Sequence, residues 1–423
     1  MRTKKIVLIC ALILLILPGI IWAAGTQEAK DQTVVLKWPT IWVGQDTKTA
    51  MVATLVDEFN EMYTGKYRVE IEANPDYDVY RNKLNSQIAA GIVPDLFVFN
   101  PDPTSFAFYE GENLLMDFSD ELASGWGDDF VPGSVEEATI NGETKTVPFE
   151  MAYTPIWYNM DILKKAGVTS IPTTYDEFFA AADKIKAAGY IPTSQMTGGT
   201  NAWTSMLWFS HIAASLGGPD VWQKDITDPV FVQSAEILKE MFLNGNTSKD
   251  AVGGDAGVSG GHYLAGRSAI FINGPWYIGR VKSDAPDVFA ATKIGPAPGA
   301  AYHGAQIGFP LSNLAAAYTD DQKKKEAVVA FMKWMTKPEN VKRISLDSGA
   351  MFAIKYSVAP EEKINQLQAQ FINAVNDASF INPSFSMKYT SDVVAEFGQA
   401  LAKMVLGKAT PEEFVQQIAD KIR

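Results

Sequence analysis

The sequence is poor in the residues that most often carry chemistry in enzymes. Its 423 residues include one cysteine, Cys10, and three histidines, His211, His262 and His303, which lie far apart. A disulfide needs two cysteines, and zinc ligands usually occur in closely spaced pairs. The sequence also lacks a Gly-x-x-x-x-Gly-Lys loop and a dinucleotide-binding fingerprint. We therefore expect no cofactor, no metal site and no catalytic residue.

Positive charge is scarce as well. The 36 Lys and Arg residues are outnumbered by 49 Asp and Glu residues, which gives a formal net charge of −13. An acidic chain repels phosphate backbones and anionic membrane surfaces. We therefore expect no nucleic-acid partner.

The N-terminal segment has the layout of an export signal. Three basic residues within positions 2–5 precede an apolar run over residues 6–17, Pro18-Gly19 breaks the run, and Ala23-Ala24-Gly25 offers small residues for cleavage. This order predicts a secretory signal peptide over residues 1–25. The alternative is a retained anchor, because adding residues 20–22 brings the run near the ~20 residues that span a bilayer.

The position of Cys10 argues against a lipid anchor. A lipoprotein signal places its cysteine at the end of the apolar run, whereas Cys10 follows Ile9 in the middle of it. Cleavage would leave about 398 residues with a charge of −16 and no cysteine. We expect this mature protein in the periplasm or another extracytoplasmic space.

The mature length predicts two lobes, because it exceeds what one hydrophobic core usually supports. Strand and helix patterns alternate in the first part, with strands over residues 34–38, 68–71 and 94–99 and helices over 51–62 and 80–88. The apolar stretch 94–99 is typical of a buried strand in a mainly parallel sheet. This order indicates a doubly wound α/β lobe.

A second α/β unit follows from Pro148 through Phe271. Within it, Thr174 and Glu177 form a capping box that predicts a helix start, and a second capping box lies at residues 410–413. The glycine-rich stretch Gly253 to Gly261 predicts a mobile loop. The C-terminal part is expected to be mainly helical.

Two sequence patterns could indicate catalysis. Gly257 to Gly261 matches the Gly-x-Ser-x-Gly elbow, but that motif needs a preceding strand, and here a glycine run surrounds it. We therefore interpret this match as chance. Asp102 and Glu150 could form a general acid–base pair, or they could bind sugar hydroxyls. The sequence does not separate these two roles, and we expect that the protein is not an enzyme.

The aromatic residues are more informative. Sugars present apolar faces ringed by hydroxyls, so their sites combine aromatic platforms with a few polar side chains. Six aromatic residues fall at expected strand ends or loops, where ligands of open α/β sheets bind: Trp42, Phe99, Tyr153, Trp203, Trp208 and Trp276. Each could instead fill a core, and for Phe99 and Trp208 a core role and a ligand-binding role are equally supported. Trp276 follows the turn Asn273-Gly274-Pro275, which would project its indole away from the sheet.

Four segments in order carry a resemblance to a known family. The stretch Ile270 to Trp276 resembles the segment of maltodextrin-binding proteins whose tryptophan stacks on the sugar. Residues 94–102, 148–159 and 326–338 resemble, in turn, a strand ending in cleft residues, a crossover between lobes and a late helix. The chain is thus similar to family 1 extracellular solute-binding proteins of ABC importers.

The resemblance implies a two-lobe periplasmic-binding-protein fold, with the ligand in a cleft between α/β lobes and three hinge crossings. The boundaries it implies are residues 33–147 plus 294–335 for lobe 1, 148–280 plus 338–423 for lobe 2, and crossings near Pro148, at 281–293 and at 334–338.

The resemblance also implies a carbohydrate ligand, an ABC transporter permease as partner, and a monomer. Trp276 would be the main platform, Asp102 would hold hydroxyls, and Phe99 stands where the family has a tryptophan. The expected ligand-binding residues are Trp276, Asp102, Trp42, Tyr153, Trp203, Glu150, Asp76, Tyr77, Phe99, Asn100 and Gln306. A secreted glycoside hydrolase and a ligand-binding subunit of a sensory receptor remain alternatives.

Overall fold

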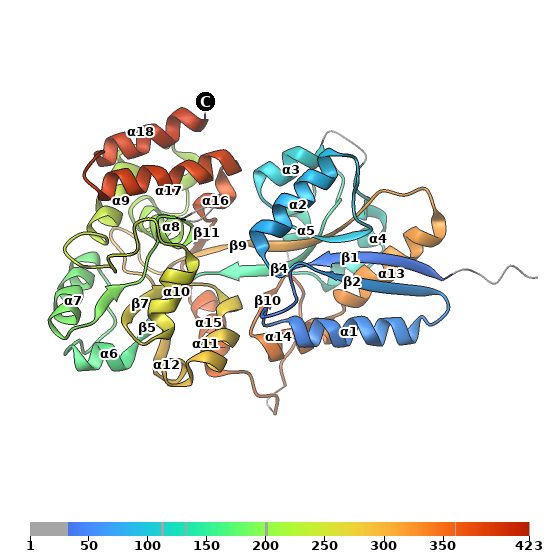
Figure 1. The fold of residues 1–423 in the computed structure, drawn as a ribbon, viewed down its shortest axis with the longest axis horizontal. Helices are drawn as coiled ribbons and strands as arrows, with labels where there is room; N and C mark the ends of the chain where they lie inside the picture. The colour runs from blue at the N-terminus through green and yellow to red at the C-terminus, as the bar shows by residue number, and fades with distance from the viewer. Residues whose placement is uncertain (1–32, 111–113, 132, 199–201, 360, 423) are drawn as a thin grey trace, which may run out of the picture.

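The computed structural model describes residues 33–110, 114–131, 133–198, 202–359 and 361–422. These residues form two lobes that lie side by side (Figure 1). The expected signal peptide and Cys10 lie outside the described residues. Within the described ranges, none of the helices has the length and apolar character needed to cross a membrane.

The first lobe takes its elements from two parts of the chain. They are β1 (Val34–Thr40), α1 (Thr49–Met62), β2 (Tyr67–Ala73), α2 (Tyr77–Ala89), β3 (Leu96–Phe99), α3 (Pro103–Glu110), α4 (Ser119–Ala123), α5 (Ser134–Glu137), α13 (Gln322–Met335), α14 (Pro338–Ser348) and β10 (Met351–Phe352). The helix α1 forms because Val52, Leu55 and Phe59 recur at helical spacing, and this face is buried in the lobe.

The second lobe holds the remaining helices and most of the remaining strands. They are β5 (Ile156–Asn159), α6 (Met160–Lys165), α7 (Tyr175–Ala187), β6 (Ile191–Thr193), α8 (Trp203–Gly217), α9 (Pro229–Glu240), α10 (Ala256–Leu264), β7 (Ser268–Ile272), α11 (Ile278–Asp284), α12 (Pro286–Ala291), β8 (Thr292–Gly295), α15 (Gln366–Asn376), β11 (Phe380–Asn382), α16 (Phe385–Lys388), α17 (Ser391–Val405) and α18 (Pro411–Ile422). Both expected capping boxes are confirmed: Thr174 accepts from the backbone N–H of Glu177 at 3.2 Å, and Thr410 accepts from that of Glu413 at 3.2 Å.

Two strands join the lobes. The strand β4 (Val147–Tyr153) leads directly into β5 of the second lobe. The 12-residue strand β9 (Ala305–Ala316) pairs with β11 through its first three residues and with β4 and β3 farther along. Figure 1 shows both strands running across the middle of the molecule. One continuous ladder therefore connects the two lobes.

The sheets are mixed rather than mainly parallel, which corrects the expectation for residues 94–99. The strands β1 and β2 are parallel, but β3 pairs with β9 antiparallel, with Leu96 opposite Ala316. In the second lobe, β6 and β7 are parallel and β5 is antiparallel to both of its neighbours. An apolar run indicates that a strand is buried on both faces. It does not indicate whether the neighbouring strand, which is distant in sequence, runs parallel or antiparallel to it.

The apolar cores group residues from distant parts of the chain. Val341 and Ile344 of α14 pack in the core of the first lobe, since Pro338 begins a helix there rather than ending the lobe. Ile294 and Ile307 pack in the cores of the second lobe. The helices α11 and α12 and the turn before α14 lie where the sequence predicted crossings, at 281–293 and 334–338.

Most of the glycine-rich stretch is helical and not a loop, and only residues 253–255 precede the helix. Residues 256–264 form the helix α10, which Asp255 caps by accepting from the backbone N–H of Val258 at 3.1 Å. A side chain at Gly260 would overlap the hydroxyl of Tyr277, so glycine lets this helix pack closely on its neighbour. The N-cap residue Asp255 therefore favoured a helix here more strongly than the glycines favoured a loop.

Candidate ligand-binding site

Two tryptophans form a partly exposed aromatic pair on the second lobe. Trp203 begins α8, and Trp276 lies in a single 3₁₀ turn that follows β7. Their ring centroids are 6.0 Å apart with an interplanar angle of 60°. Both rings lie partly buried at the edges of separate apolar cores. This pair presents partly exposed aromatic surface on the second lobe.

The turn before Trp276 is held by packing and by a hydrogen bond. The indole N–H of Trp157 donates to the backbone carbonyl of Asn273 at 2.9 Å. A Cβ atom at Gly274 would overlap the six-membered ring of Trp276, so the indole lies directly against this backbone. The local sequence thus fixes the orientation of Trp276 without any contribution from a ligand.

Tyr153 lies at the junction of the lobes. It ends β4 and pairs with Gly308 of β9, and its ring covers the space where a side chain at Gly308 would lie. Burial raises the pKa of the Tyr153 hydroxyl, and the charge of Glu137 adds to that shift. The phenol therefore stays neutral and available as a hydrogen-bond donor at physiological pH.

On the first lobe, Asp102 is the centre of a polar cluster. Its carboxylate accepts from the backbone N–H of Ser105 at 2.7 Å and from Arg81 at 3.0 Å, and the Asn100 side-chain amide also donates to it. Asp102 thereby caps α3. Sequence reasoning missed Arg81, although Tyr77 and Arg81 stand one helical turn apart on α2.

The first turn of α2 carries the neighbouring expected residues. Asp76 caps this helix by accepting from the backbone N–H of Val79 at 2.8 Å. Tyr77 is 42% exposed, and the guanidinium of Arg81 lies 5.8 Å from the centre of its ring. Arg81 therefore links Tyr77 to Asp102, and the structure brings Tyr77, Asn100 and Asp102 together.

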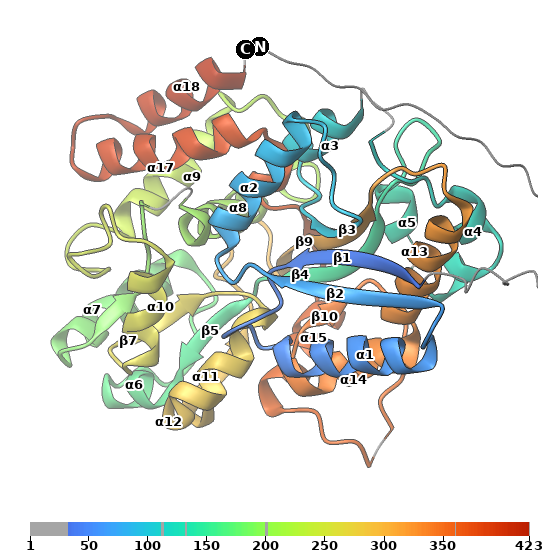
Figure 2. The ribbon, with the colours of Figure 1, turned by 45° about the vertical axis from the view of Figure 1, so that its right-hand side comes forward.

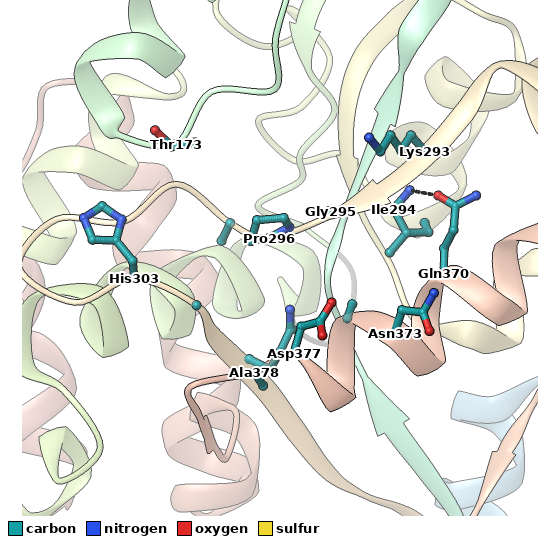
Figure 3. Close-up of a pocket in the computed structure, with 14 residues that line it drawn as sticks. Thr173, Lys293, Ile294, Gly295, Pro296, His303, Gln370, Asn373, Asp377 and Ala378 are labelled. Carbon is teal, nitrogen blue, oxygen red and sulfur yellow. Dashed lines mark hydrogen bonds between the residues drawn. The ribbon is translucent and has the colours of Figure 1, made fainter.

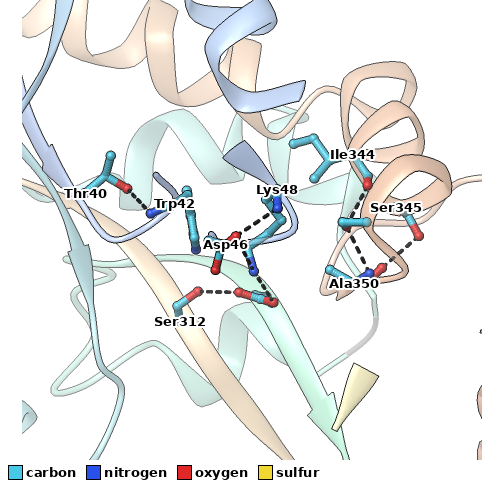
Figure 4. Close-up of polar contacts among 10 residues, drawn as sticks. Thr40, Trp42, Asp46, Lys48, Ser312, Ile344, Ser345 and Ala350 are labelled. Atoms are coloured by element: carbon cyan, nitrogen blue, oxygen red, sulfur yellow. Dashed lines mark hydrogen bonds and ion pairs between the residues drawn. The ribbon is translucent and has the colours of Figure 1, made fainter. Parts of the chain in front are cut away.

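Glu150 takes part in a buried ion pair that the sequence did not reveal. Lys48 Nζ lies 3.2 Å from a Glu150 carboxylate oxygen and 3.3 Å from Asp46, and the Ser312 hydroxyl donates to Glu150 at 3.4 Å (Figure 4). Burial disfavours the charge of Lys48, but the carboxylates of Glu150 and Asp46 outweigh it and raise the pKa of Lys48. Glu150 is 2% exposed, and its carboxylate is engaged in this buried ion pair.

Trp42 and Phe99, which the sequence suggested as ligand platforms, are both buried in the first lobe. Each is 1% exposed. Trp42 packs edge-on against Trp38 at 5.7 Å, and Phe99 packs against Phe106 at 5.1 Å between ring centroids. Trp208 is likewise buried in the second lobe.

The expected site residues are divided between the two lobes, with the aromatic pair on the second lobe and the Asp102 cluster on the first. Figures 1 and 2 show the end of α17 beside α2 and α3 of the first lobe. In agreement with this, the backbone N–H of Ser391 donates to the Thr104 hydroxyl at 2.7 Å. Gln306 is separate from both groups, because it lines a cavity of the second lobe that none of the other expected residues lines. The described residues contain no cluster of His, Cys, Asp and Glu suited to a metal ion.

This architecture is that of a binding protein built from two lobes. Residues 44–342 match the family described as bacterial extracellular solute-binding protein, and the chain belongs to this family. It is 28% identical over 331 residues to a maltotriose-binding protein of Pyrococcus abyssi, covering 77% of this chain and 67% of that one. It is 24% identical over 305 residues to an arabinooligosaccharide-binding protein of Bacillus subtilis, covering 69% and 67%. The fold matches that of a chitin oligosaccharide binding protein with a TM-score of 0.82 at 21% identity, over 92% and 98% of the chains.

Proposed function

We propose that this protein binds a carbohydrate between its two lobes, outside the cytoplasm, and delivers it to an ABC transporter permease. The observation that carries this proposal is the aromatic pair of Trp203 and Trp276, which is partly exposed and held in place without ligand. Flat apolar rings suit the C–H faces of sugars, and the polar cluster around Asp102 offers partners for hydroxyls. The relatives named for binding sugar oligomers support the same ligand class.

Titration calorimetry with a panel of oligosaccharides tests the proposal. The panel includes maltotriose, arabino-oligosaccharides and chitin oligosaccharides, with sn-glycerol 3-phosphate as an anionic control. We expect one sugar class to bind and the anion not to bind, because the guanidinium of Arg81 is already paired with Asp102. Binding of the anion together with no response to any sugar would contradict the carbohydrate assignment.

The binding is proposed to close the lobes by a hinge motion, as in other two-lobe binding proteins. The proposed hinge segments are the passage near Thr154 and the middle of β9. Small-angle scattering should give a smaller radius of gyration with saturating sugar than without it. A sugar that raises the melting temperature but leaves the scattering profile unchanged would argue against closure.

We further propose that the mature protein is monomeric, does not bind nucleic acid and does not turn over its ligand. Both carboxylates considered for catalysis are engaged, Asp102 with Arg81 and Glu150 with Lys48. A general acid must be free to give its proton to the reacting oxygen. Incubation with oligosaccharides followed by chromatography should show no products. Hydrolysis that Asp102→Asn or Glu150→Gln abolishes would favour a glycoside hydrolase instead.

A further inference from the structure

The second lobe contains a cavity that lies apart from the aromatic pair. It has a volume of about 690 Å³ and is lined by β8, α15, the first residues of β9 and the loop before them (Figure 3). Pockets of this size accommodate small molecules. Of the residues that sequence analysis assigned to the ligand, Gln306 alone lines it.

Gln306 gives the cavity an unsatisfied polar group. The residue is 2% exposed, and its side-chain oxygen has no hydrogen-bond partner among the described residues. Buried polar groups in folded proteins are nearly always paired, but this oxygen is itself closed to solvent, so the donors and acceptors for a ligand must come from other lining residues.

The other polar side chains suit a neutral ligand. The side-chain oxygen of Gln370 accepts from the backbone N–H of Ile294 at 2.8 Å, which fixes the side chain and leaves its NH₂ group as a donor. Asn373, on the same helix and one turn of chain away, adds a second amide. Lys293 and Asp377, which carry opposite charges, also line the cavity, together with the imidazole of His303 (Figure 3).

The lining also separates this cavity from the proposed oligosaccharide site. It includes no Trp, Tyr or Phe ring, so a ligand here would be held by hydrogen bonds and not by stacking. Amides and a hydroxyl-bearing partner form hydrogen bonds in both directions, which is how uncharged polyols are recognised. The walls between these groups are small and apolar, including Pro296 and Ala374.

We propose that this cavity is a second binding site, for a small uncharged polyhydroxylated molecule whose hydroxyls form hydrogen bonds with the amides of Gln370 and Asn373. The test uses the purified mature protein with myo-inositol and D-glucitol as probes at millimolar concentration. Hydrogen–deuterium exchange should show protection at residues 293–297 and 366–378. Glycine betaine serves as the zwitterionic comparison and should give none.

Three variants test whether the polyols bind in this cavity. Ala374→Trp should fill the cavity and abolish the protection, and Asn373→Ala should weaken polyol binding about tenfold, as expected for the loss of a hydrogen bond. Asn82→Ala, at an exposed position of α2, is the matched control and should change nothing. Protection by betaine but not by the polyols, or protection that survives Ala374→Trp, would overturn the proposal.

One further variant separates this site from the oligosaccharide site. Trp276→Ala should weaken oligosaccharide binding and leave the polyol protection of β8 and α15 intact. Loss of polyol protection in Trp276→Ala would show that the polyols bind at the aromatic pair, which overturns the second site but leaves the proposed carbohydrate function standing. Absence of any polyol protection in the wild type would likewise overturn the second site alone.

Discussion

The indole of Trp203 meets the indole of Trp276 edge to face at 6.0 Å, although one ring begins helix α8 and the other follows strand β7. Aromatic pairs in this geometry contribute about 0.5–1.5 kcal/mol beyond the area they bury. Each ring therefore restricts the other before any ligand arrives. A preorganised aromatic surface loses little side-chain entropy when a sugar binds.

Removal of the platform should separate binding from folding. Trp276→Ala should weaken oligosaccharide binding by roughly 2–4 kcal/mol, or about 30- to 1,000-fold, as for a buried aromatic hot spot. Stability should fall little, because the ring is partly exposed without ligand. Calorimetry with sugar measures the affinity, and denaturant unfolding without sugar measures the unfolding free energy.

Trp208→Ala is the matched control for this experiment. Its ring is fully buried, so truncation should cost about 3–5 kcal/mol of unfolding free energy. Unchanged affinity together with a large loss of stability in Trp276→Ala would show that Trp276 is a core residue and that the site lies elsewhere.

The orientation of Trp276 should depend on Gly274. A methyl group at this position would overlap the indole, so Gly274→Ala must displace the ring. We expect affinity for the oligosaccharide to fall at least tenfold, with a shift in tryptophan fluorescence. Gly261→Ala in α10 meets no atom within 4 Å, and this control should leave affinity unchanged. Equal affinity in Gly274→Ala and wild type would mean that the packing of Trp276 on Gly274 does not matter for binding.

The buried pair of Lys48 and Glu150 should behave as a unit. Lys48→Met leaves a buried carboxylate without its cation and should cost about 3–5 kcal/mol of unfolding free energy, whereas Lys48→Met with Glu150→Leu should recover most of that loss. The exposed pair of Lys37 and Glu72, at 3.9 Å, is the control, and Lys37→Met should cost less than about 1 kcal/mol. Additive losses in the double variant would indicate that the two residues do not act together.

His211 should make stability depend on pH. Burial lowers its pKa to about 4, and its Nε2–H donates to the Thr154 carbonyl at 2.8 Å where the chain leaves the first lobe. The unfolded chain takes up a proton below about pH 6.5 that the folded protein does not accept until about pH 4. Stability should therefore be full above pH 6.5 and fall as pH decreases, by up to roughly 3 kcal/mol from this residue.

Urea unfolding at several pH values between 7.5 and 4.5 checks this prediction. His211→Gln keeps a side-chain donor but cannot titrate, so its stability should fall less than that of the wild type over this range. Other groups contribute equally to both proteins, and the difference isolates His211. Parallel curves would mean that His211 is not responsible.

Features encoded within a few residues could be predicted from the sequence. The capping boxes at Thr174 and Thr410 formed where expected, because an N-cap needs only a side chain and a backbone amide three residues away. The turn Asn273-Gly274-Pro275 likewise left Trp276 partly exposed. The two-lobe architecture also followed, since length and the alternation of strands and helices are properties of the chain itself.

Only the tertiary structure decided which side chains are free to meet a ligand. Trp42 and Trp276 have similar local surroundings in sequence, yet distant residues enclose Trp42 and leave Trp276 partly open. The pairing of Lys48 with Glu150 joins residues 102 positions apart, and no local pattern marks it. The antiparallel direction of β3 and the lobe that holds α14 depend in the same way on distant partners. Periodicity and capping act over a few residues, whereas burial, ion pairing and strand direction depend on which remote segment packs there.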